Sequence, residues 1–477
     1  MLHQLKRLAR HSAIYGLGGI VSRAVAVFLL PLYTRYLDPS DLGEVGVLIA
    51  LSAVLVTILR GGISSAFFRF YFDSPEPDRR RTVLRTSFWF TMGMATLGLA
   101  AGVGLAGPIA DALTVGDPNL VRAAFVGLWA QMNYEQLTAL FRVEERSLGF
   151  LAASLVNIAI TVGATVVLVV GLEQGALGVI VGNFTGTLAV YLALLGYRRE
   201  QLGLTFDRSL LRAMNRFGLP LVPSALALIA LNFSDRFFLA RLASLDELGL
   251  YDFGFRIASV MVLLLTAFRT AWPAFAYSIA DEDEARRTYG FVLTYLVALA
   301  SWLALALGLL APWLVRLLAP SNPDFWPGAR VVAPLAFASA LFAGYIVVSI
   351  GVGRARRTGF NWVITGFAAL VNVALNLALV PRYGMEGSAA AAVISFAVLF
   401  TTMAVHAQRI YPVPYQWRRV LTALAAAAAL TIAAKALDAP LAVAVALALA
   451  YPFALLPLGF YLPAELRAVR RRRVAPR

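Results

Sequence analysis

Charged side chains inside long apolar segments are the most informative residues of this sequence. Such an arginine costs about 2.5 to 3.5 kcal/mol at the centre of a membrane helix, so each needs a partner or water. Buried cations of this kind can bind phosphate groups. The candidate substrate-binding arginines are Arg23, Arg60, Arg236 and Arg256. The candidate ion-pair or ion-coupling acids are Glu135, Asp235 and Asp252. A fifth arginine, Arg269, lies near a helix end, where it can reach the interface.

The first two arginines flank one predicted hairpin. Counted from a turn near residue 40, Arg23 and Arg60 differ by roughly three residues, or about 5 Å in depth. Two cations at similar depth could clamp a diphosphate. The alternative is a structural salt bridge from Arg60 to an acid such as Glu135.

A second predicted hairpin, in "NFSDRFFLARLASLDELGLYDFG", carries the other charges. Adjacent residues on a helix point about 100° apart, so we expect Asp235 and Arg236 not to neutralise each other. Around a turn near residue 245, Asp235 and Arg256 lie level, which predicts an ion pair between them. That pair is either a structural staple or a proton- or Na⁺-coupled switch that frees Arg256 for a substrate phosphate.

The elements that must position these charges are membrane helices. Hydrophobic residues make up 60% of the 477 residues, and the mean hydropathy is +0.76. Each span needs roughly 20 apolar residues. The sequence therefore predicts an all-α integral membrane protein with fourteen transmembrane helices: 12–37, 42–68, 86–108, 120–141, 149–171, 176–197, 217–240, 248–278, 289–312, 329–352, 360–380, 387–408, 419–437 and 440–462.

The distribution of basic residues orients these helices. A cytoplasmic N-terminus places most Lys and Arg residues on the cytoplasmic side, so both termini are expected there, with the first span retained rather than cleaved. The clusters "DRRRTVLR", "GRARR" and "RAVRRRR" act either as topology anchors or as contacts to anionic lipid head groups. Composition favours a bacterial source, so we expect a multi-pass protein of the bacterial inner membrane.

An internal repeat divides the chain. "RYLDPSDLG" (35–43) matches "RLASLDELG" (241–249) at an offset of 206 residues, and "QGALG" (174–178) matches "YGMEG" (383–387) at 209. We predict a six-helix lobe over 1–208, a second over 209–416, and an added helix pair with a basic tail over 417–477. Six helices per lobe give both lobes the same topology, so a substrate site is expected between them.

Several classes of function are excluded by what the sequence lacks. Cysteine is absent and there are three histidines, so we expect no catalytic thiolate, metal site or cofactor. No phosphate-binding GxxxxGK[ST] motif occurs, and no interhelical segment exceeds about twenty residues, too short for a soluble catalytic domain. The net charge of +15 lies in short segments between apolar runs, so nucleic acid is not an expected partner.

Two helix-packing motifs are also present. Gly178, Gly182 and Gly186 form a GxxxGxxxG ridge that predicts a close helix contact. Asn372 and Asn376 share one helix face and predict interhelical hydrogen bonds, with sugar contacts as the alternative.

The chain resembles the polysaccharide flippases of the multidrug/oligosaccharidyl-lipid/polysaccharide exporter superfamily. The resemblance is carried by "LLPLYTRYLDPSDLGEVGV", "FGLPLVPS", "SDRFFLARLASLDELGLYDFGFRI" and "LVPRYGMEGSAAAAV". It implies two lobes around a central cavity and alternating access that moves a polyprenyl-diphosphate-linked glycan outward. It also implies membrane lipids and glycan polymerase or ligase machinery as partners. Arg23, in "GIVSRAV", looks like a cavity arginine of the related lipid II flippases.

Two other functions compete with a flippase. One is a cation-coupled drug or metabolite antiporter of the same superfamily, and the other is a membrane enzyme acting on the same carrier lipid. Five arginines against three acids within the predicted spans favour an anionic ligand, and the short outer segments disfavour an enzyme. The sequence therefore predicts a transporter, with no catalytic residues.

Overall fold

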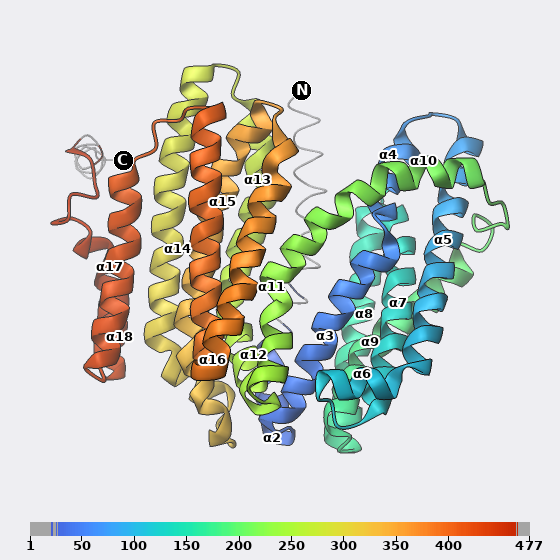
Figure 1. Ribbon diagram of the computed structural model, residues 1–477, viewed down its shortest axis with the longest axis horizontal. Helices are drawn as coiled ribbons and strands as arrows, with labels where there is room; N and C mark the ends of the chain where they lie inside the picture. The colour runs from blue at the N-terminus through green and yellow to red at the C-terminus, as the bar shows by residue number, and fades with distance from the viewer. Residues whose placement is uncertain (1–20, 22–24, 26, 464, 466–477) are drawn as a thin grey trace, which may run out of the picture. The chain divides into compact units, whose positions relative to one another are not determined.

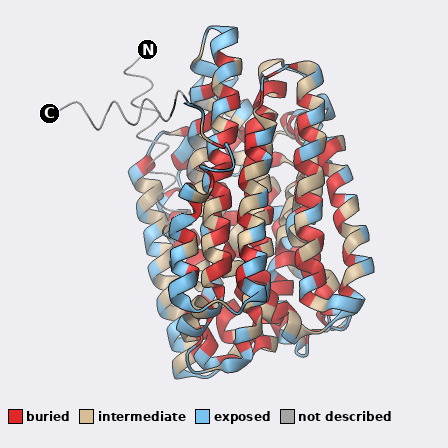
Figure 2. Cartoon of the chain, turned by 90° about the vertical axis from the view of Figure 1, so that its left-hand side faces the viewer, coloured by how far each residue is buried: buried red, intermediate tan, exposed pale blue. Residues whose placement is uncertain are grey.

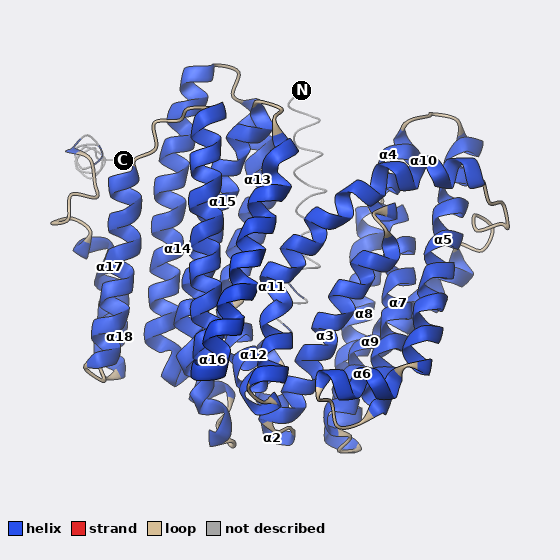
Figure 3. Cartoon of the chain, viewed as in Figure 1, coloured by secondary structure: helices blue, strands red, loops and turns tan. Residues whose placement is uncertain are grey.

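The computed structural model describes residues 21, 25, 27–463 and 465. Helices account for every regular element in this described part, which contains no strand (Figure 3). Ten of its helices are long and apolar enough to cross a membrane: Pro39–Arg60, Pro77–Gly104, Ser147–Gly171, Gly175–Tyr197, Arg208–Leu242, Val260–Ser278, Glu282–Leu318, Pro323–Arg354, Thr358–Ile410 and Trp417–Ala436. The chain is thus a multi-pass, all-helical membrane protein.

The predicted count of fourteen spans is not confirmed, for reasons that are visible in the helices. The expected span 12–37 lies largely outside the described residues. Helix α16 (Asn361–Ile410) covers two expected spans and is kinked at Gly384, whose φ is +50°. Helices α7 (Pro118–Val143) and α18 (Leu441–Ala454) occupy two further expected spans but are not among the ten.

The described chain separates into two compact units. The first comprises residues up to Phe253 together with Ala319–Phe325 and Thr365–Ser388, and the second comprises Gly254–Leu318, Trp326–Ile364 and Ala389 onward. These units are defined by which residues pack together, whereas the predicted lobes 1–208 and 209–416 are defined by the sequence repeat. The two divisions measure different properties, so the predicted lobes stay a prediction. Each unit is described separately.

Most helices of the first unit, short and long, lie along one stretch of chain (Figure 1). They are α2 (Leu30–Tyr36), α3 (Pro39–Arg60), α4 (Ile63–Phe72), α5 (Pro77–Gly104), α6 (Ala106–Leu113), α7, α8 (Ser147–Val166), the π-helix η1 (Val167–Gly171), α9 (Gly175–Tyr197), α10 (Arg208–Gly218), η2 (Leu219–Leu221), α11 (Val222–Leu242) and most of α12 (Leu245–Ala258). Helix α3 packs along both α7 and α11, and α9 packs between α7 and α8. These contacts place α3 beside the charged residues of two other helices.

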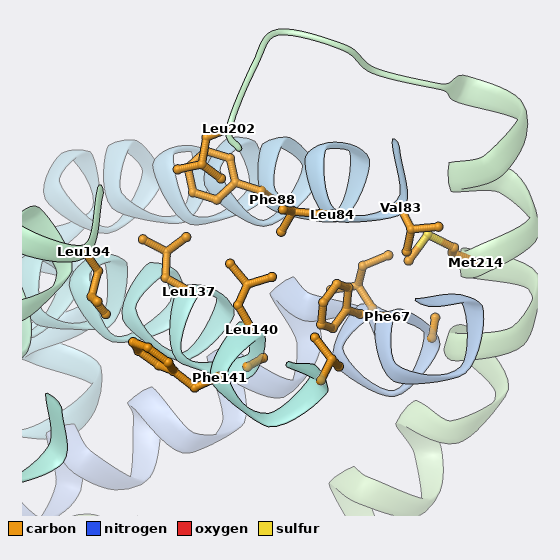
Figure 4. Close-up of a cluster of buried hydrophobic side chains, with 14 of the residues drawn as sticks. Phe67, Val83, Leu84, Phe88, Leu137, Leu140, Phe141, Leu194, Leu202 and Met214 are labelled. Carbon is orange, nitrogen blue, oxygen red and sulfur yellow. The ribbon is translucent and has the colours of Figure 1, made fainter. Parts of the chain in front are cut away.

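A buried aromatic and aliphatic cluster holds one end of this unit together (Figure 4). Phe67 of α4, Val83 of α5 and Leu140 of α7 are buried in it together with Met214 of α10. The cluster therefore fixes α10, a short helix outside the main bundle, against α4 and α5.

The glycine ridge of α9 packs as predicted. A Cβ added to Gly182 would collide with Thr165 of α8, and one added to Gly186 would collide with Asn157 and Thr161. Thr161 also donates a hydrogen bond to the Asn183 carbonyl at 3.3 Å. Small residues thus let the two helices approach closely, as is common in membrane proteins.

The second unit is built around α14 (Glu282–Leu318). It is packed by α13 (Val260–Ser278), α15 (Ala329–Arg354), α17 (Trp417–Ala436) and α18. A cluster rich in alanine joins α14, α17 and α18. Stripes of buried and exposed residues run along the helices in Figure 2, as expected for helices that present one face to a core and another to lipid.

An ion pair closes the second unit near its C-terminal end. Arg419 of α17 is buried and makes two contacts to Glu465, at 2.9 and 3.2 Å. Its guanidinium also lies 4.8 Å from the ring centroid of Phe460. A two-point arginine–carboxylate contact is strong and directional, so this pair fastens the segment after α18 to α17.

Candidate functional sites in the first compact unit

Arg60 ends α3 and reaches across to α7. Its Nη1 lies 2.6 Å from Glu135 Oε2, and its Nη2 donates to the Met132 carbonyl at 3.0 Å. Gln131 donates to the other Glu135 oxygen at 2.9 Å. The Glu135 side chain keeps 36% of its surface exposed and that of Arg60 keeps 13%. The Arg60–Glu135 salt bridge, the alternative given by the sequence, is therefore present, and the Glu135 side chain is partly exposed.

Arg236 sits in a closed cluster of charges between α11 and α12. Its Nη1 lies 3.2 Å from Asp235 Oδ1, and its Nη2 lies 3.0 Å from Asp252 Oδ1. The Tyr251 hydroxyl donates to the other Asp235 oxygen. All four side chains are buried. A guanidinium enclosed by two carboxylates is held as a structural ion pair rather than presented to a ligand.

The expectation that Asp235 and Arg236 do not neutralise each other is wrong. The 100° rule describes where Cβ atoms point, but an arginine side chain is long enough to turn back toward its neighbour. Arg236 also donates to the Asn232 carbonyl, one helical turn earlier, at 3.1 Å. Its guanidinium thus lies along its own helix, within reach of Asp235.

The predicted Asp235–Arg256 pair stays a prediction. Asp235 is bound by Arg236 and Tyr251, whereas Arg256 belongs to the second compact unit, where it is half-buried on α12. Arg269 is exposed, but it lies midway along α13 (Val260–Ser278), so the expectation of a position near a helix end is wrong. Arg23 lies outside the described residues.

The first pair of repeated turns makes reciprocal contacts. A Cβ on Gly43 of α3 would collide with the Leu245 carbonyl, and a Cβ on Gly249 of α12 would collide with the Pro39 carbonyl. At the offset of 206, Gly43 corresponds to Gly249 and Pro39 to Leu245. Each helix start therefore packs on the other through equivalent residues, the pattern that a local two-fold axis produces.

Asp252 lies across the same contact. A Cβ on Gly46 would collide with the Asp252 carboxylate. Gly46 and Asp252 are themselves equivalent at the 206-residue offset. The absence of a side chain at Gly46 thus leaves the space in which Asp252 meets Arg236.

The second pair of repeated turns is also alike in structure. Gly175 and Gly384 have φ values of +54° and +50°, which glycine adopts at little cost. Next to Gly384, the Met385 N–H donates to Glu247 at 2.6 Å. Gly175 lies close to Asp41, the equivalent of Glu247. The two turns are therefore alike: an acid near the start of a helix, Asp41 or Glu247, lies close to a glycine with positive φ, Gly175 or Gly384.

A chain of neutral polar groups links α11 with α16. Ser234 donates to Asn372 at 2.7 Å, Asn376 donates to Asn372 at 3.1 Å, and Ser388 donates to Asn376 at 2.7 Å. All four side chains are buried. The predicted hydrogen bonds of the two asparagines are present, and each asparagine is occupied by protein partners. The sequence analysis did not identify Ser234, Ser388 and Tyr251 as members of these sites. Ser234 and Tyr251 each directly precede an acid that had been identified, and this position was the available signal.

The chemistry available at these sites is ion pairing and hydrogen bonding. Within the described residues, no group of three or more His, Asp or Glu side chains is arranged to hold a metal ion. Of the two groups of charges, the Arg60–Glu135 pair is the more exposed to its surroundings, and the cluster of Arg236 with Asp235 and Asp252 is buried.

Known structures share this fold. The lipid II flippase MurJ in an inward closed conformation superposes with a TM-score of 0.71 at 11% identity, over 92% of this chain and 98% of that chain. A multidrug resistance MATE family transporter of the MOP superfamily gives 0.69 at 14% identity in its inward-facing conformation, over 83% of this chain and 94% of that chain. A multidrug resistance MATE family transporter of the MOP superfamily in an outward-facing conformation gives 0.60 at 14% identity, over 85% of this chain and 95% of that chain. The likeness predicted from the sequence motifs is confirmed at the level of fold.

Sequence comparison identifies the family. No curated protein sequence matches the chain. A family model described as polysaccharide biosynthesis protein matches residues 32–322, more than half of the chain, including α3, the Arg60–Glu135 pair and the Arg236 cluster. The chain belongs to this family of polysaccharide biosynthesis proteins.

Proposed function

We propose that this protein is a flippase that moves a polyprenyl-diphosphate-linked oligosaccharide from the cytoplasmic to the outer leaflet of the bacterial inner membrane. The product would enter cell-surface polysaccharide assembly, with glycan polymerase or ligase machinery as downstream partners. The observation that carries the proposal is the polysaccharide biosynthesis family match over residues 32–322. The fold, shared with transporters over most of the chain, supports alternating access as the mechanism.

Arg60 is the described side chain best suited to bind the diphosphate. An arginine in a membrane helix requires a counter-charge, and Glu135 supplies it in the absence of substrate. A diphosphate could take the place of Glu135 at Arg60, since phosphate also binds arginine through two parallel hydrogen bonds. Gln131 would keep its hydrogen bond to the displaced carboxylate. Arg23 and Arg256 remain proposed substrate-binding residues.

Arg236 is a weaker candidate, because a phosphate would have to displace two buried carboxylates. The candidate site charges that the structure describes in the first unit pair with each other: Arg60 with Glu135, and Arg236 with Asp235 and Asp252. The excess of arginines in the sequence therefore does not by itself separate a flippase from a cation-coupled antiporter. The family match favours the flippase.

Transport in proteoliposomes tests the proposal. A fluorescent polyprenyl-diphosphate oligosaccharide would be followed across the bilayer with wild type and with Arg23→Ala, Arg60→Ala and Arg256→Ala, under imposed proton and Na⁺ gradients. A matched control is Arg122→Ala, an exposed arginine of α7 that pairs only with Asn119 among the interactions described for it. We expect transport by wild type and the control, and roughly tenfold or greater loss in Arg60→Ala, since a charge-assisted hydrogen bond is worth about 1.5 to 3 kcal/mol.

The outcomes separate the function from the site. Transport that survives all three substitutions would retain the flippase and reject the proposed diphosphate site. Absence of glycan transport by wild type, together with export of cationic dyes driven by either gradient, would reject the flippase in favour of an antiporter.

A further inference from the structure

Helix α10 presents an ordered row of arginines that the proposed transport function does not use. Arg208, Arg212 and Arg216 are exposed and spaced four residues apart, so they share one face of the helix. Between them, Leu210 and Met214 are buried in the cluster with α4 and α5 (Figure 4). The apolar face of α10 is thus buried against α4 and α5, and its basic face is exposed.

A fourth arginine extends this row. Arg69 of α4 is exposed, and its guanidinium lies 4.5 Å from the ring centroid of Phe217, the residue after Arg216. Together Arg69, Arg208, Arg212 and Arg216 are called the α10 basic surface. Two helices that are far apart in sequence therefore contribute to one patch of positive charge.

No acid of α10 balances this charge. The helix contains three arginines and no Asp or Glu between residues 208 and 218. The acid that precedes it, Asp207, caps the helix: it accepts from the N–H groups of Ser209 and Leu210 at 2.8 and 3.0 Å. The Leu210 N–H and the Ser209 side chain hold the pKa of Asp207 below its ordinary value, so this carboxyl is charged and already engaged. Among the residues that the structure describes, none of these three arginines forms an ion pair with an acid.

The order of residues along the chain indicates where this surface lies relative to the bilayer. Helix α10 runs through η2 into the apolar α11, and residues Arg208–Leu242 form one span candidate. Leu219 and Leu221, just after the last arginine, are 54% and 43% exposed. The arginines therefore precede an apolar, exposed segment, which is the order expected where lipid phosphates give way to acyl chains.

We propose that the α10 basic surface binds the head groups of anionic phospholipids such as phosphatidylglycerol. A topology signal needs only enough positive charge in an interhelical segment. It does not require a helix docked by its apolar face with arginines aligned on the other. This inference rests on the membrane embedding of the chain and is independent of the transported substrate.

Lipid binding to the full-length protein in neutral detergent tests the proposal. Native mass spectrometry would count bound phosphatidylglycerol and phosphatidylcholine of identical acyl chains across a titration. The test variant carries three substitutions: Arg208→Gln, Arg212→Gln and Arg216→Gln. The control variant also loses three exposed arginines, but from separate helices: Arg122→Gln, Arg316→Gln and Arg382→Gln. A third variant keeps the charge, with lysine at 208, 212 and 216.

We expect wild type, the control and the lysine variant to prefer phosphatidylglycerol, and the glutamine variant to bind it at least about tenfold more weakly. Each arginine near an anionic surface contributes about 1 kcal/mol, or roughly fivefold. The same thermal midpoint for all four proteins without added lipid would exclude misfolding as the cause.

Three results would overturn the proposal. They are equal phosphatidylglycerol binding by wild type and the glutamine variant, equal binding of the two lipids by wild type, and an equal loss in the control variant. Inorganic diphosphate provides a further arm. If it displaces phosphatidylglycerol from wild type at similar concentration, the surface recognises a free phosphate group and not a lipid head group. None of these results bears on glycan transport.

Discussion

The two hairpins α2–α3 and α11–α12 have matching turns but different charges. Both turns place a glycine against the other's helix start, through Gly43 and Gly249. At the offset of 206 residues, however, the charged cluster of the second hairpin corresponds to apolar or small residues in the first. Asp235, Arg236, Tyr251 and Asp252 stand where the first hairpin has Leu29, Leu30, Val45 and Gly46.

This difference shows which part of the hairpin is architecture. The glycine contacts need only small residues at fixed positions, and both copies retain them. The charges are additional: the second hairpin places a guanidinium between two carboxylates, in space that Gly46 leaves open. The second hairpin therefore depends on electrostatic pairing in a way that the first does not.

The largest expected effect comes from removing the central cation of the second hairpin. Arg236→Met would leave Asp235 and Asp252 buried without their shared partner. Breaking a buried ion pair typically costs about 3 to 5 kcal/mol. The equivalent substitution in the first hairpin, Leu30→Met, exchanges one buried apolar side chain for another and should cost less than about 1.5 kcal/mol.

Denaturation midpoints of the purified proteins in detergent would measure both changes. Similar losses in Arg236→Met and Leu30→Met would show that the charged cluster does not stabilise the second hairpin. Recovery of stability when Asp235→Asn and Asp252→Asn are added to Arg236→Met would identify the stranded carboxylates as the cause.

A smaller effect, equal in the two hairpins, is expected at the glycine contacts. Gly43→Ala and Gly249→Ala each place a methyl group against a backbone carbonyl, which cannot move aside as a side chain can. Overpacking of this kind costs roughly 1 to 3 kcal/mol. Gly93→Ala on α5 is the control, because a Cβ there meets nothing within 4 Å.

Denaturation midpoints in detergent also measure these changes. The test is whether Gly43→Ala and Gly249→Ala lose the same stability. If Gly43→Ala is tolerated and Gly249→Ala is not, the reciprocal packing is not a shared architectural contact. Loss of stability in Gly93→Ala would show that alanine is generally harmful in these helices.

These sites separate what sequence could predict from what it could not. The repeated glycines were identifiable because close backbone approach demands glycine at fixed spacing, and both copies keep it. The membrane helices were identifiable from apolar length. The number of spans was not confirmed. In α16, however, two helices meet at a kink at Gly384, whose backbone is not helical, where the sequence predicts a break between two spans.

Side-chain partners were harder to predict, because they depend on reach rather than on helix geometry. The Arg60–Glu135 contact could be suggested from the sequence, because Glu135 is one of the few acids within the predicted spans. The Asp235–Arg236 contact was missed because helical angles fix Cβ directions and not the position of a guanidinium several bonds further away. Tyr251 escaped notice because a tyrosine in an apolar helix is usually read as a packing residue.

The smallest difference between the hairpins concerns the acids at their equivalent positions, Asp41 and Glu247. Glu247 accepts a hydrogen bond from the Met385 N–H at 2.6 Å, whereas Asp41 accepts one from Asp38 in its own turn at 3.1 Å. Glu247→Ala would leave a backbone donor beside Gly384 unpaired and should cost about 1.5 kcal/mol. Asp41→Ala removes an exposed local bond and should cost about 0.5 to 1 kcal/mol.

Hydrogen exchange at Met385 and Gly175 would locate these effects as well as size them. Faster exchange of the Met385 N–H in Glu247→Ala, with little change near Gly175 in Asp41→Ala, is the expected pattern. Equal protection of Met385 in wild type and Glu247→Ala would contradict it. Because a glutamate is one methylene longer than an aspartate, side-chain length is the expected cause of this asymmetry. Glu247→Asp should then lose much of the bond to Met385, and Asp41→Glu should slow exchange near Gly175; unchanged exchange in both variants would reject side-chain length as the cause.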